Sequence, residues 1–297
     1  MRTNLHPVTE QDRTRVADLL ASVRGATDSG AAVFKLLDPD AARFEARPWP
    51  AGGSAGEWVR APGADGPGVV LYLHGRRFQH DEPPSVYAGA LSAATGLPVL
   101  HAHYRLAPAH PYPAALEDVL AAYAALLEQG HAADRIALVG HSAGATLALS
   151  ALLRLRESAL PMPACTVALS PITDFTLSGA TLADNAERDV LGINEFHQVR
   201  SAYLGSADPA GAPQSPLFGD CSGLPPLLVT CGEAEMLRAD GIRFAERAEA
   251  AGNDVTLHVY ELMPHGFPVL PFDASADLSR RVGTFIRDRF AALAPAG

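Results

Sequence analysis

Short apolar runs alternate with longer amphipathic segments along most of the chain. The runs are VVLYL (69–73), LPVLHAHY (97–104), IALVG (136–140), CTVALS (165–170), PLLVTC (226–231) and VTLHVY (255–260). Between them, apolar residues recur with a period near 3.6, most clearly over residues 116–127 and 278–290. Continuous apolar strands that alternate with amphipathic helices predict an α/β fold, with a mostly parallel central sheet covered by helices on both faces.

Three regions depart from this rhythm. Residues 9–24 carry a helical stripe, and a Pro/Gly/Ala-rich passage over 47–68 reads as loop around a short strand, EWVR. Residues 176–218 contain weak helical patterns and no convincing strand. We therefore expect an N-terminal cap region over 1–50 and a catalytic domain over 51–297, with 176–218 as a helical cap insertion. The alternative for 176–218 is an insertion without function.

Composition narrows the class of protein. The chain has 297 residues, of which 48% are hydrophobic and 19% charged, and its net charge is −10. An acidic chain disfavours nucleic acid and anionic membranes as partners. Three cysteines without a CxxC pair favour a reducing compartment. With neither a signal-peptide pattern nor a long apolar run, a cytoplasmic location is expected.

A serine stands in a turn between a strand and a helix. Gly140, Ser142 and Gly144 form G-x-S-x-G after IALVG, and a good helical pattern follows. A nucleophilic serine needs a tight, strained turn that projects its oxygen above the sheet, and the glycines leave room for the neighbouring strand and helix. The alternative is a serine that only caps the helix.

Such a serine needs a base and an acid that orients the base. In this fold type the chain order is serine, acid, histidine. Glu233 and Glu235 follow the run PLLVTC, and His265 follows VTLHVY. Both positions are carboxyl ends of predicted parallel strands, where such a sheet keeps its site.

Taken together, the motifs resemble the hormone-sensitive-lipase-like branch of the α/β-hydrolases, bacterial carboxylesterases with an HGGG loop. The resemblance covers roughly residues 57–290. It rests on LYLHG, YRLAPAHPYPAALEDVLAAY, GHSAG, LSPITDFTLSG, PPLLVTCGEAEML and MPHGF, in this order. It implies an α/β-hydrolase fold, favours Glu235 over Glu233 through a G-x-x-[D/E]-x-L pattern, and matches His265 to the family's base. Pairing of two copies through an edge strand, for which VTLHVY is a candidate, is implied by analogy only.

The family's glycine loop is altered here. Where His-Gly-Gly-Gly is usual, the chain reads His74-Gly75-Arg76-Arg77-Phe78. Backbone N–H groups of Arg76, Arg77 and Ala143 are the expected oxyanion donors, because any residue except proline keeps this donor. A left-handed backbone at either arginine would cost about 1–2 kcal/mol. Losing one oxyanion donor costs about 3–4 kcal/mol of barrier, so we expect the oxyanion hole to persist.

The arginine side chains leave two alternatives open. A guanidinium that faces the pocket would favour a substrate carboxylate or phosphate. Alternatively, both heads point outward and pair with Asp81 or Glu82.

Further substitutions lie nearby. Family members usually carry Asp at His103 and Glu at Ala109, and these acids normally brace the oxyanion loop, so its support is expected to be rebuilt. His101 and His103 share one strand face and suggest a metal pair, but the sequence places no carboxylate or cysteine motif beside them, so we expect no metal site. Asp174 reads as a structural turn acid.

The sequence therefore predicts a serine hydrolase that cleaves a small carboxylic ester or lactone through an acyl-enzyme, without metal or organic cofactor. Ser142, Glu235 and His265 are the catalytic residues, and Phe78, His141 and Phe267 are candidate substrate contacts. The alternatives are a biosynthetic acyltransferase, cyclase or lyase on the same scaffold, and a non-catalytic small-molecule-binding protein.

Overall fold

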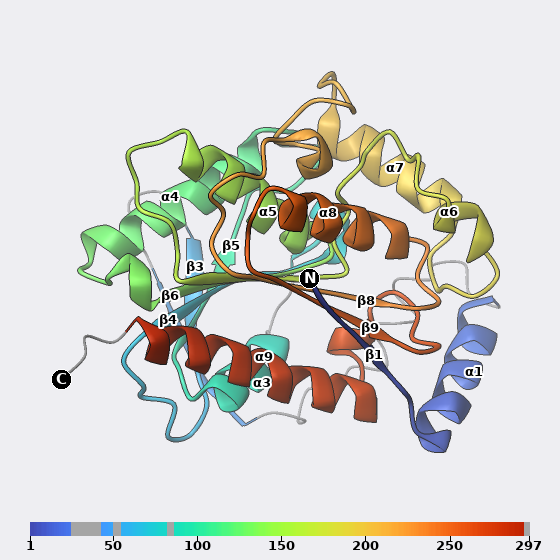
Figure 1. Ribbon diagram of the computed structural model, residues 1–297, viewed down its shortest axis with the longest axis horizontal. Helices are drawn as coiled ribbons and strands as arrows, with labels where there is room; N and C mark the ends of the chain where they lie inside the picture. Colours follow the sequence, from blue (N-terminus) through green and yellow to red (C-terminus); the bar gives the residue numbers. More distant parts are fainter. Residues whose placement is uncertain (25–42, 50–54, 82–85, 294–297) are drawn as a thin grey trace.

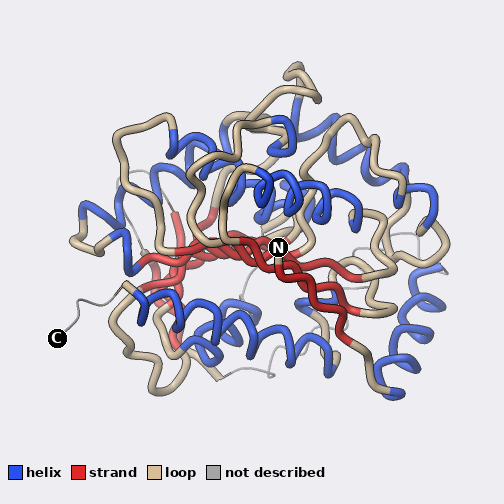
Figure 2. Tube along the Cα trace, in the orientation of Figure 1, coloured by secondary structure: helices blue, strands red, loops and turns tan. Residues whose placement is uncertain are grey.

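A single sheet runs through the protein, with helices on both faces (Figure 1, Figure 2). The computed structural model describes residues 1–24, 43–49, 55–81 and 86–293. The strands are β1 (Arg2–His6), β2 (Glu45–Pro48), β3 (Ala55–Arg60), β4 (Val69–Leu73), β5 (Val99–His103), β6 (Ile136–His141), β7 (Cys165–Leu169), β8 (Leu227–Gly232) and β9 (Val255–Tyr260).

The described strands form one sheet in the order β1-β9-β8-β7-β6-β4-β5-β3-β2. In this spatial order, the first seven strands, from β1 through β9 and β4 to β5, are parallel to their neighbours. The last two are antiparallel, because β3 pairs antiparallel with β5 and β2 antiparallel with β3. Every strand predicted from an apolar run is present. The side chains of β4, β6, β7 and β8 are all buried, which explains why their sequences are continuously apolar.

Two helical layers cover the sheet. The helices are α1 (Glu10–Arg24), α3 (Val86–Thr95), α4 (Ala114–Glu128), α5 (Ala143–Arg156), α6 (Thr181–Asp184), α7 (Ile193–Leu204), α8 (Arg238–Ala250) and α9 (Asp273–Ala292). Helices α4, α5 and α8 lie on one face, and α3 and α9 lie on the other (Figure 1). Each layer buries its own apolar cluster against the sheet, because parallel strands offer two apolar faces.

The N-terminal helix is fixed to the C-terminal helix. The Asp12 carboxylate of α1 is fully buried and accepts hydrogen bonds from the N–H groups of Asp273 and Ala274, both at 2.9 Å. These are the first N–H groups of α9, which have no partner within their own helix. Val16 and Leu19 of α1 join the apolar cluster beneath α3 and α9.

The structure corrects two expectations about the sheet. VTLHVY is β9, but it is not an edge strand, because β1 pairs along its outer side. Residues 1–50 contribute two strands, β1 and β2, and are therefore not only a cap region. No apolar run marks these strands, since most of their side chains are exposed. Residues 25–42 and residue 50 of the expected cap region lie outside the described residues.

Residues 176–218 contain no strand, and helices alternate there with turns and loops. They hold α6, α7 and a short 3₁₀ turn, Pro216–Phe218. This cap insertion lies above the sheet on the side of α8 (Figure 1). No helix of the described residues combines the length and apolarity that a membrane span requires.

Candidate active site

The strand β6 and the helix α5 are joined through Ser142 alone. Its backbone has φ 52° and ψ −116°, a strained conformation for a residue with a side chain. A Cβ at Gly140 would lie 2.2 Å from the Gly144 carbonyl oxygen, and one at Gly144 would lie 2.0 Å from the Leu73 carbonyl oxygen. Both positions therefore require glycine, and the turn packs directly against the end of β4.

Three side chains from separate strand ends meet above this turn. The Ser142 Oγ lies 2.9 Å from His265 Nε2, and His265 Nδ1 lies 3.2 Å from Glu235 Oε2. Ser142 is 7% exposed and His265 6%, while Glu235 is fully buried. An ionised carboxylate only accepts hydrogen bonds, so His265 donates through Nδ1 and keeps a lone pair at Nε2 for the serine proton.

The second oxygen of Glu235 is also engaged. It accepts hydrogen bonds from the Ser170 hydroxyl at 2.7 Å and the Gly232 N–H at 2.6 Å. Burial alone would lower the pKa of His265, but the hydrogen bond and charge of Glu235, together with the charge of Asp189, outweigh it and raise that pKa above its usual value. The arrangement stabilises the imidazolium that forms when His265 takes a proton.

Asp189 is a site residue that the sequence did not reveal. Its carboxylate accepts hydrogen bonds from the N–H groups of His265 at 2.7 Å, Met236 at 2.6 Å and Val190 at 2.8 Å. It thereby joins the loop of the base to the loop of the acid. Burial raises the pKa of Asp189 to about 6. It lies in the cap insertion, where only weak helical patterns were visible, and no motif marks it.

The other candidate acids lie elsewhere. Glu233 accepts a hydrogen bond from the Leu262 N–H at 3.1 Å and pairs with Arg188 at 3.4 Å. Asp174 accepts hydrogen bonds from Thr176 and Ser178 of its own turn and from Arg243 at 3.0 Å, as expected for a structural turn acid.

The segment after β4 takes a left-handed turn. Arg76, Arg77 and Phe78 have φ angles of 61°, 64° and 60°. Each such residue costs about 1–2 kcal/mol. The strain considered for Arg76 and Arg77 is therefore present, and Phe78 adds a third left-handed residue. The turn packs on the serine, because a Cβ at Gly75 would lie 3.1 Å from the Ser142 Cβ.

The cap insertion holds this left-handed turn through two contacts from α7. The ring of Phe78 stacks on Tyr203 with centroids 3.8 Å apart, and Arg77 Nη2 pairs with Glu195 Oε1 at 2.7 Å. The charge of Arg77 acts to lower the pKa of His265, so its guanidinium is electrostatically coupled to the candidate base. Glu82, one of the predicted partners of the arginines, lies outside the described residues.

Three residues were predicted to contact substrate. Phe78 and Phe267 have no exposed surface, and Phe267 packs against Tyr260 with ring centroids 5.2 Å apart. Their burial favours packing beneath the site over direct contact with a ligand. His141 lies beside the base, with its ring 6.0 Å from that of His265, and burial lowers its pKa to about 3. His141 is therefore neutral at the site.

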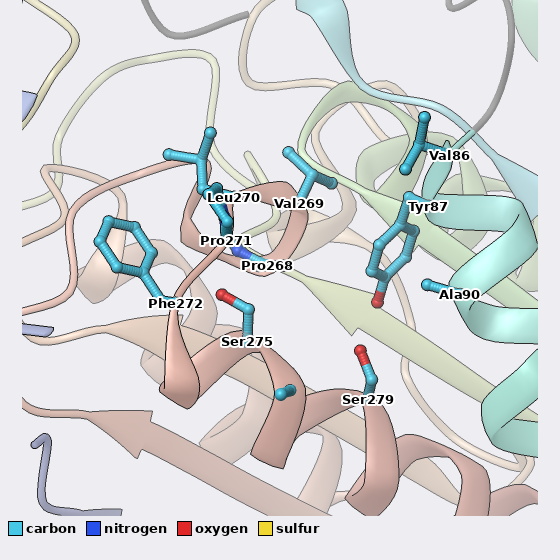
Figure 3. A pocket seen from close by; sticks show the side chains of 11 residues that line it. Val86, Tyr87, Ala90, Pro268, Val269, Leu270, Pro271, Phe272, Ser275 and Ser279 are labelled. Carbon is cyan, nitrogen blue, oxygen red and sulfur yellow. The ribbon is translucent and has the colours of Figure 1, made fainter. Parts of the chain in front are cut away.

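A hollow lies on the opposite side of the sheet. It is formed by Val86, Tyr87 and Ala90 of α3, by residues 268–272 and by Ser275, Ala276 and Ser279 of α9 (Figure 3). Its lining is mostly apolar, but it contains none of Ser142, Glu235 and His265. This hollow is therefore separate from the three side chains that meet above the serine turn.

Comparison with known proteins decides the family. A family model described as alpha/beta hydrolase fold matches residues 70–269, more than half of the chain. The chain belongs to the α/β-hydrolase family. This hydrolase is 40% identical over 222 residues to a protein named acetyl-hydrolase from Streptomyces hygroscopicus, which covers 72% of this chain and 74% of that protein. It is 36% identical over 235 residues to an esterase from Acinetobacter venetianus, and this match covers 78% of this chain and 77% of the esterase.

Solved structures narrow the family to one branch. An esterase from the bacterial hormone-sensitive lipase family superposes with a TM-score of 0.86 at 34% identity, covering 95% of this chain and 99% of that one. A hormone-sensitive lipase from a metagenome library gives a TM-score of 0.87 at 31% identity, covering 96% and 99%. These likenesses confirm both the predicted fold and the resemblance to hormone-sensitive-lipase-like carboxylesterases.

Proposed function

We propose that this hydrolase cleaves a small carboxylic ester or lactone through an acyl-enzyme formed on Ser142. The relatives named acetyl-hydrolase and esterase support ester hydrolysis. The observation that carries the assignment of residues is the 2.9 Å contact between Ser142 Oγ and His265 Nε2, with Glu235 on the far side of the imidazole.

In the first half of the reaction, Ser142 Oγ attacks the ester carbonyl while His265 Nε2 takes the hydroxyl proton. His265 then returns this proton to the leaving alcohol. In the second half, His265 takes a proton from water, the resulting hydroxide attacks the acyl-enzyme, and Ser142 leaves with the proton. Glu235 holds His265 in the required tautomer throughout. The mechanism needs no metal or organic cofactor.

Backbone N–H groups of Arg76, Arg77 and Ala143 are the proposed oxyanion donors. Ala143 is the first residue of α5, so its N–H has no partner within the helix and lies at the positive end of the helix dipole. Arg76 and Arg77 follow Gly75, which packs against the serine turn. The strain of the three left-handed residues, about 3–6 kcal/mol in total, is comparable with the catalytic gain of about 3–4 kcal/mol from each donor.

The cap insertion is proposed as a lid over the substrate. Support comes from its contacts on both sides of Ser142: Asp189 bonds to the loop of the base, while Glu195 and Tyr203 contact the left-handed turn. The cytoplasmic location stays a prediction. Pairing of two copies also stays a prediction, and β1, rather than β9, is the edge strand at that end of the sheet.

A labelling experiment tests the proposed chemistry. The protein is treated with a fluorophosphonate, the added mass is located by peptide mass spectrometry, and aryl esters from acetate to decanoate are assayed with wild type and Ser142→Ala. We expect labelling at Ser142 and turnover that the variant loses. Labelling with negligible turnover would favour the biosynthetic acyltransferase, cyclase or lyase. A folded protein that is not labelled would favour the small-molecule-binding protein.

A further inference from the structure

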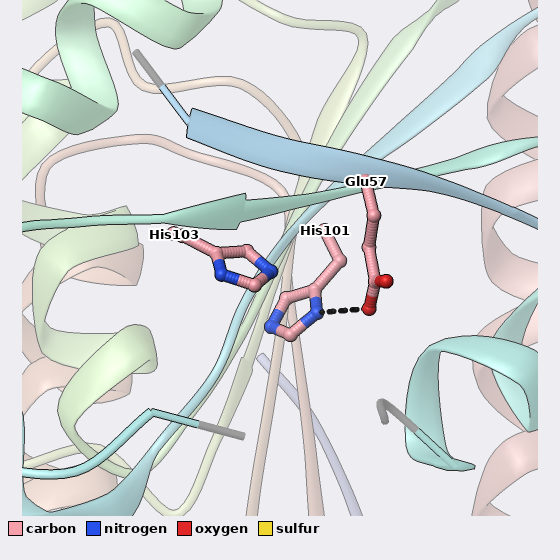
Figure 4. Close-up of side chains that lie close together, drawn as sticks. All are labelled: Glu57, His101 and His103. Carbon is pink, nitrogen blue, oxygen red and sulfur yellow. Dashed lines mark hydrogen bonds and ion pairs between the residues drawn. The ribbon is translucent and has the colours of Figure 1, made fainter. Parts of the chain in front are cut away.

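Three strands bring histidines and acids together behind the end of β4. Glu57 of β3 is the cross-strand partner of His101 in β5, and His103 follows two residues later on the same face (Figure 4). His74 comes directly after β4, and its ring centroid lies 5.4 Å from that of His101. The rings of His101 and His103 are 4.7 Å apart. None of these side chains takes part in the proposed hydrolysis.

The hydrogen bonds of the cluster fix the orientation of each imidazole. His101 Nδ1 lies 3.2 Å from Glu57 Oε1, and His103 Nδ1 lies 3.1 Å from Asp81 Oδ2. Because an ionised carboxylate only accepts, each Nδ1 carries the proton and each Nε2 keeps a lone pair. A histidine that donates one N–H to a carboxylate and offers its other nitrogen is the usual arrangement at a protein metal site.

One of these lone pairs is buried without a partner. His101 has no exposed surface, and its Nε2 makes no hydrogen bond among the described residues. In Figure 4 this nitrogen lies on the side of the ring away from Glu57, towards His103. Buried polar atoms are rarely left unpaired, and each exception indicates a missing ligand or a cost in stability.

We propose that His101 and His103 bind a divalent transition-metal ion of the zinc type through their Nε2 atoms, with Glu57 orienting His101 and Asp81 orienting His103. One potential ligand atom from each of Glu57, His101 and His103 lies within 4.8 Å of the others. Tetrahedral zinc holds its ligands about 3.4 Å apart, given metal–nitrogen lengths of about 2.0–2.1 Å. Rotation of the partly exposed His103 side chain can close most of this difference, since 27% of that side chain is exposed.

A metal at this site would stabilise the strands beside the left-handed turn and would take no part in the reaction. The site lies on β3 and β5 beside β4, whose end leads through His74 and Gly75 into the left-handed turn. The resemblance implies acids at positions 103 and 109 that brace this loop, and both are absent here. The sequence argued against a metal because no carboxylate stood near His101 and His103. Strand pairing brings Glu57 to them from 44 residues away.

Direct metal binding tests the proposal. Protein without a histidine tag is stripped with EDTA and dialysed against Zn²⁺, and bound zinc is measured by elemental mass spectrometry. Co²⁺ titration followed by visible absorption reports the ligand geometry. We expect about one ion per chain and a rise in the thermal unfolding midpoint with metal, because binding to the folded state stabilises it. The Ser142→Ala variant should bind equally, which separates this result from hydrolysis.

Three substitutions and one control identify the ligands. His101→Asn and His103→Asn should each weaken zinc binding at least about ten-fold, and Glu57→Gln by about 10–100-fold, the range for groups that orient metal ligands. His110→Gln removes an exposed histidine and should change nothing. His103 is partly exposed, so His103→Asn should fold even if His101→Asn does not. Zinc below a few tenths of an ion per chain, or stoichiometric zinc unaffected by His103→Asn and Glu57→Gln, would overturn the proposal.

Discussion

The two halves of the active site are built in different ways. On the proposed acid–base side, Glu235 accepts hydrogen bonds from the Gly232 N–H, the Ser170 hydroxyl and His265 Nδ1. Asp189 joins the loops of Glu235 and His265. On the oxyanion side, three residues in left-handed conformation follow β4 and are held by an aromatic stack and an ion pair from α7. The resemblance implies the family's usual residues in the first half and arginines in place of glycines in the second.

The difference follows from which atoms carry the chemistry. A base and its orienting acid act through side chains, so their identity cannot change without loss of function. Oxyanion donors are backbone N–H groups, which nearly any residue supplies, so the side chains of that segment are free to change if the strain is tolerated. The comparison predicts that single substitutions cost most on the acid–base side, and that on the oxyanion side the backbone matters more than the side chains.

The largest effect is expected for Glu235→Gln. The amide cannot serve as an anionic acceptor for the His265 Nδ1–H, so the imidazole loses its required tautomer and its charge stabilisation. An equivalent change in a serine triad costs roughly 10⁴-fold in kcat, and we expect the same order here with aryl acetates. Glu233→Gln, two residues earlier in the same loop, is the control and should retain most activity. Similar losses in both variants would contradict the assignment of Glu235.

Gly75→Ala tests the oxyanion side through its backbone. The new Cβ would lie 3.0 Å from the His141 carbonyl oxygen and 3.1 Å from the Ser142 Cβ, so the left-handed turn and the serine turn must separate by a few tenths of an ångström. Displacing one donor should lower kcat by roughly 10²-fold, while KM changes little. Gly192→Ala is the matched control, because its Cβ would meet only Glu195 Oε2 at 3.7 Å. Unchanged kcat in Gly75→Ala would remove this segment from the oxyanion hole.

Most of the acid–base side could be predicted from the sequence. Apolar runs marked the strands β4 to β9, and Ser142, Glu235 and His265 stand at strand ends in recognisable motifs. Asp189 could not be predicted in this way, because its role depends on the folding of a segment with weak patterns against two distant loops. The two strands in residues 1–50 were missed because exposed polar side chains give no alternation of apolar residues.

The oxyanion side was harder to predict. The sequence gives Arg76 and Arg77 but not their backbone angles or the Glu195 partner, which lies more than a hundred residues away. The cluster of Glu57, His101 and His103 likewise depends on strand pairing between segments that no local motif connects. In both cases the missing information is the contact between distant parts of the chain.

Asp189→Asn should have an intermediate effect on the acid–base side. Asparagine offers one acceptor oxygen where the carboxylate offers two, so a buried N–H group of Met236 or His265 loses its partner, at a cost of about 1–3 kcal/mol. We expect kcat to fall about ten-fold, which corresponds to a rise of about 1.4 kcal/mol in the activation barrier. The charge of Asp189 also raises the pKa of His265. Its removal should therefore move the acidic limb of kcat/KM to lower pH.

The pH profile separates this role from a loss of folding. The exposed Asp184→Asn in α6 is the control and should shift neither kcat nor the acidic limb. A lower midpoint of thermal unfolding in Asp189→Asn, with kcat and the limb unchanged, would reduce Asp189 to a purely structural residue.

The smallest effect is expected for Arg77→Gln. It should shift the acidic limb of kcat/KM in the direction opposite to the shift in Asp189→Asn. The charge of Arg77 lowers the pKa of His265, so its loss should raise that pKa further. His265 acts as a base only when neutral, and the acidic limb of kcat/KM should therefore move to higher pH, whereas Asp189→Asn moves it to lower pH. Stability should fall by at most about 1 kcal/mol, because the pair with Glu195 is partly exposed.

The control is Arg200→Gln, which removes an arginine of α7 in the cap insertion and should leave the acidic limb in place. Opposite shifts in Arg77→Gln and Asp189→Asn would mean that each half of the site acts on His265 through charge, although only the acid–base half touches it by hydrogen bonds. If the acidic limb of kcat/KM in Arg77→Gln moved to lower pH or stayed in place, the charge of Arg77 would not act on His265. The arginines would then affect only the backbone of the left-handed turn.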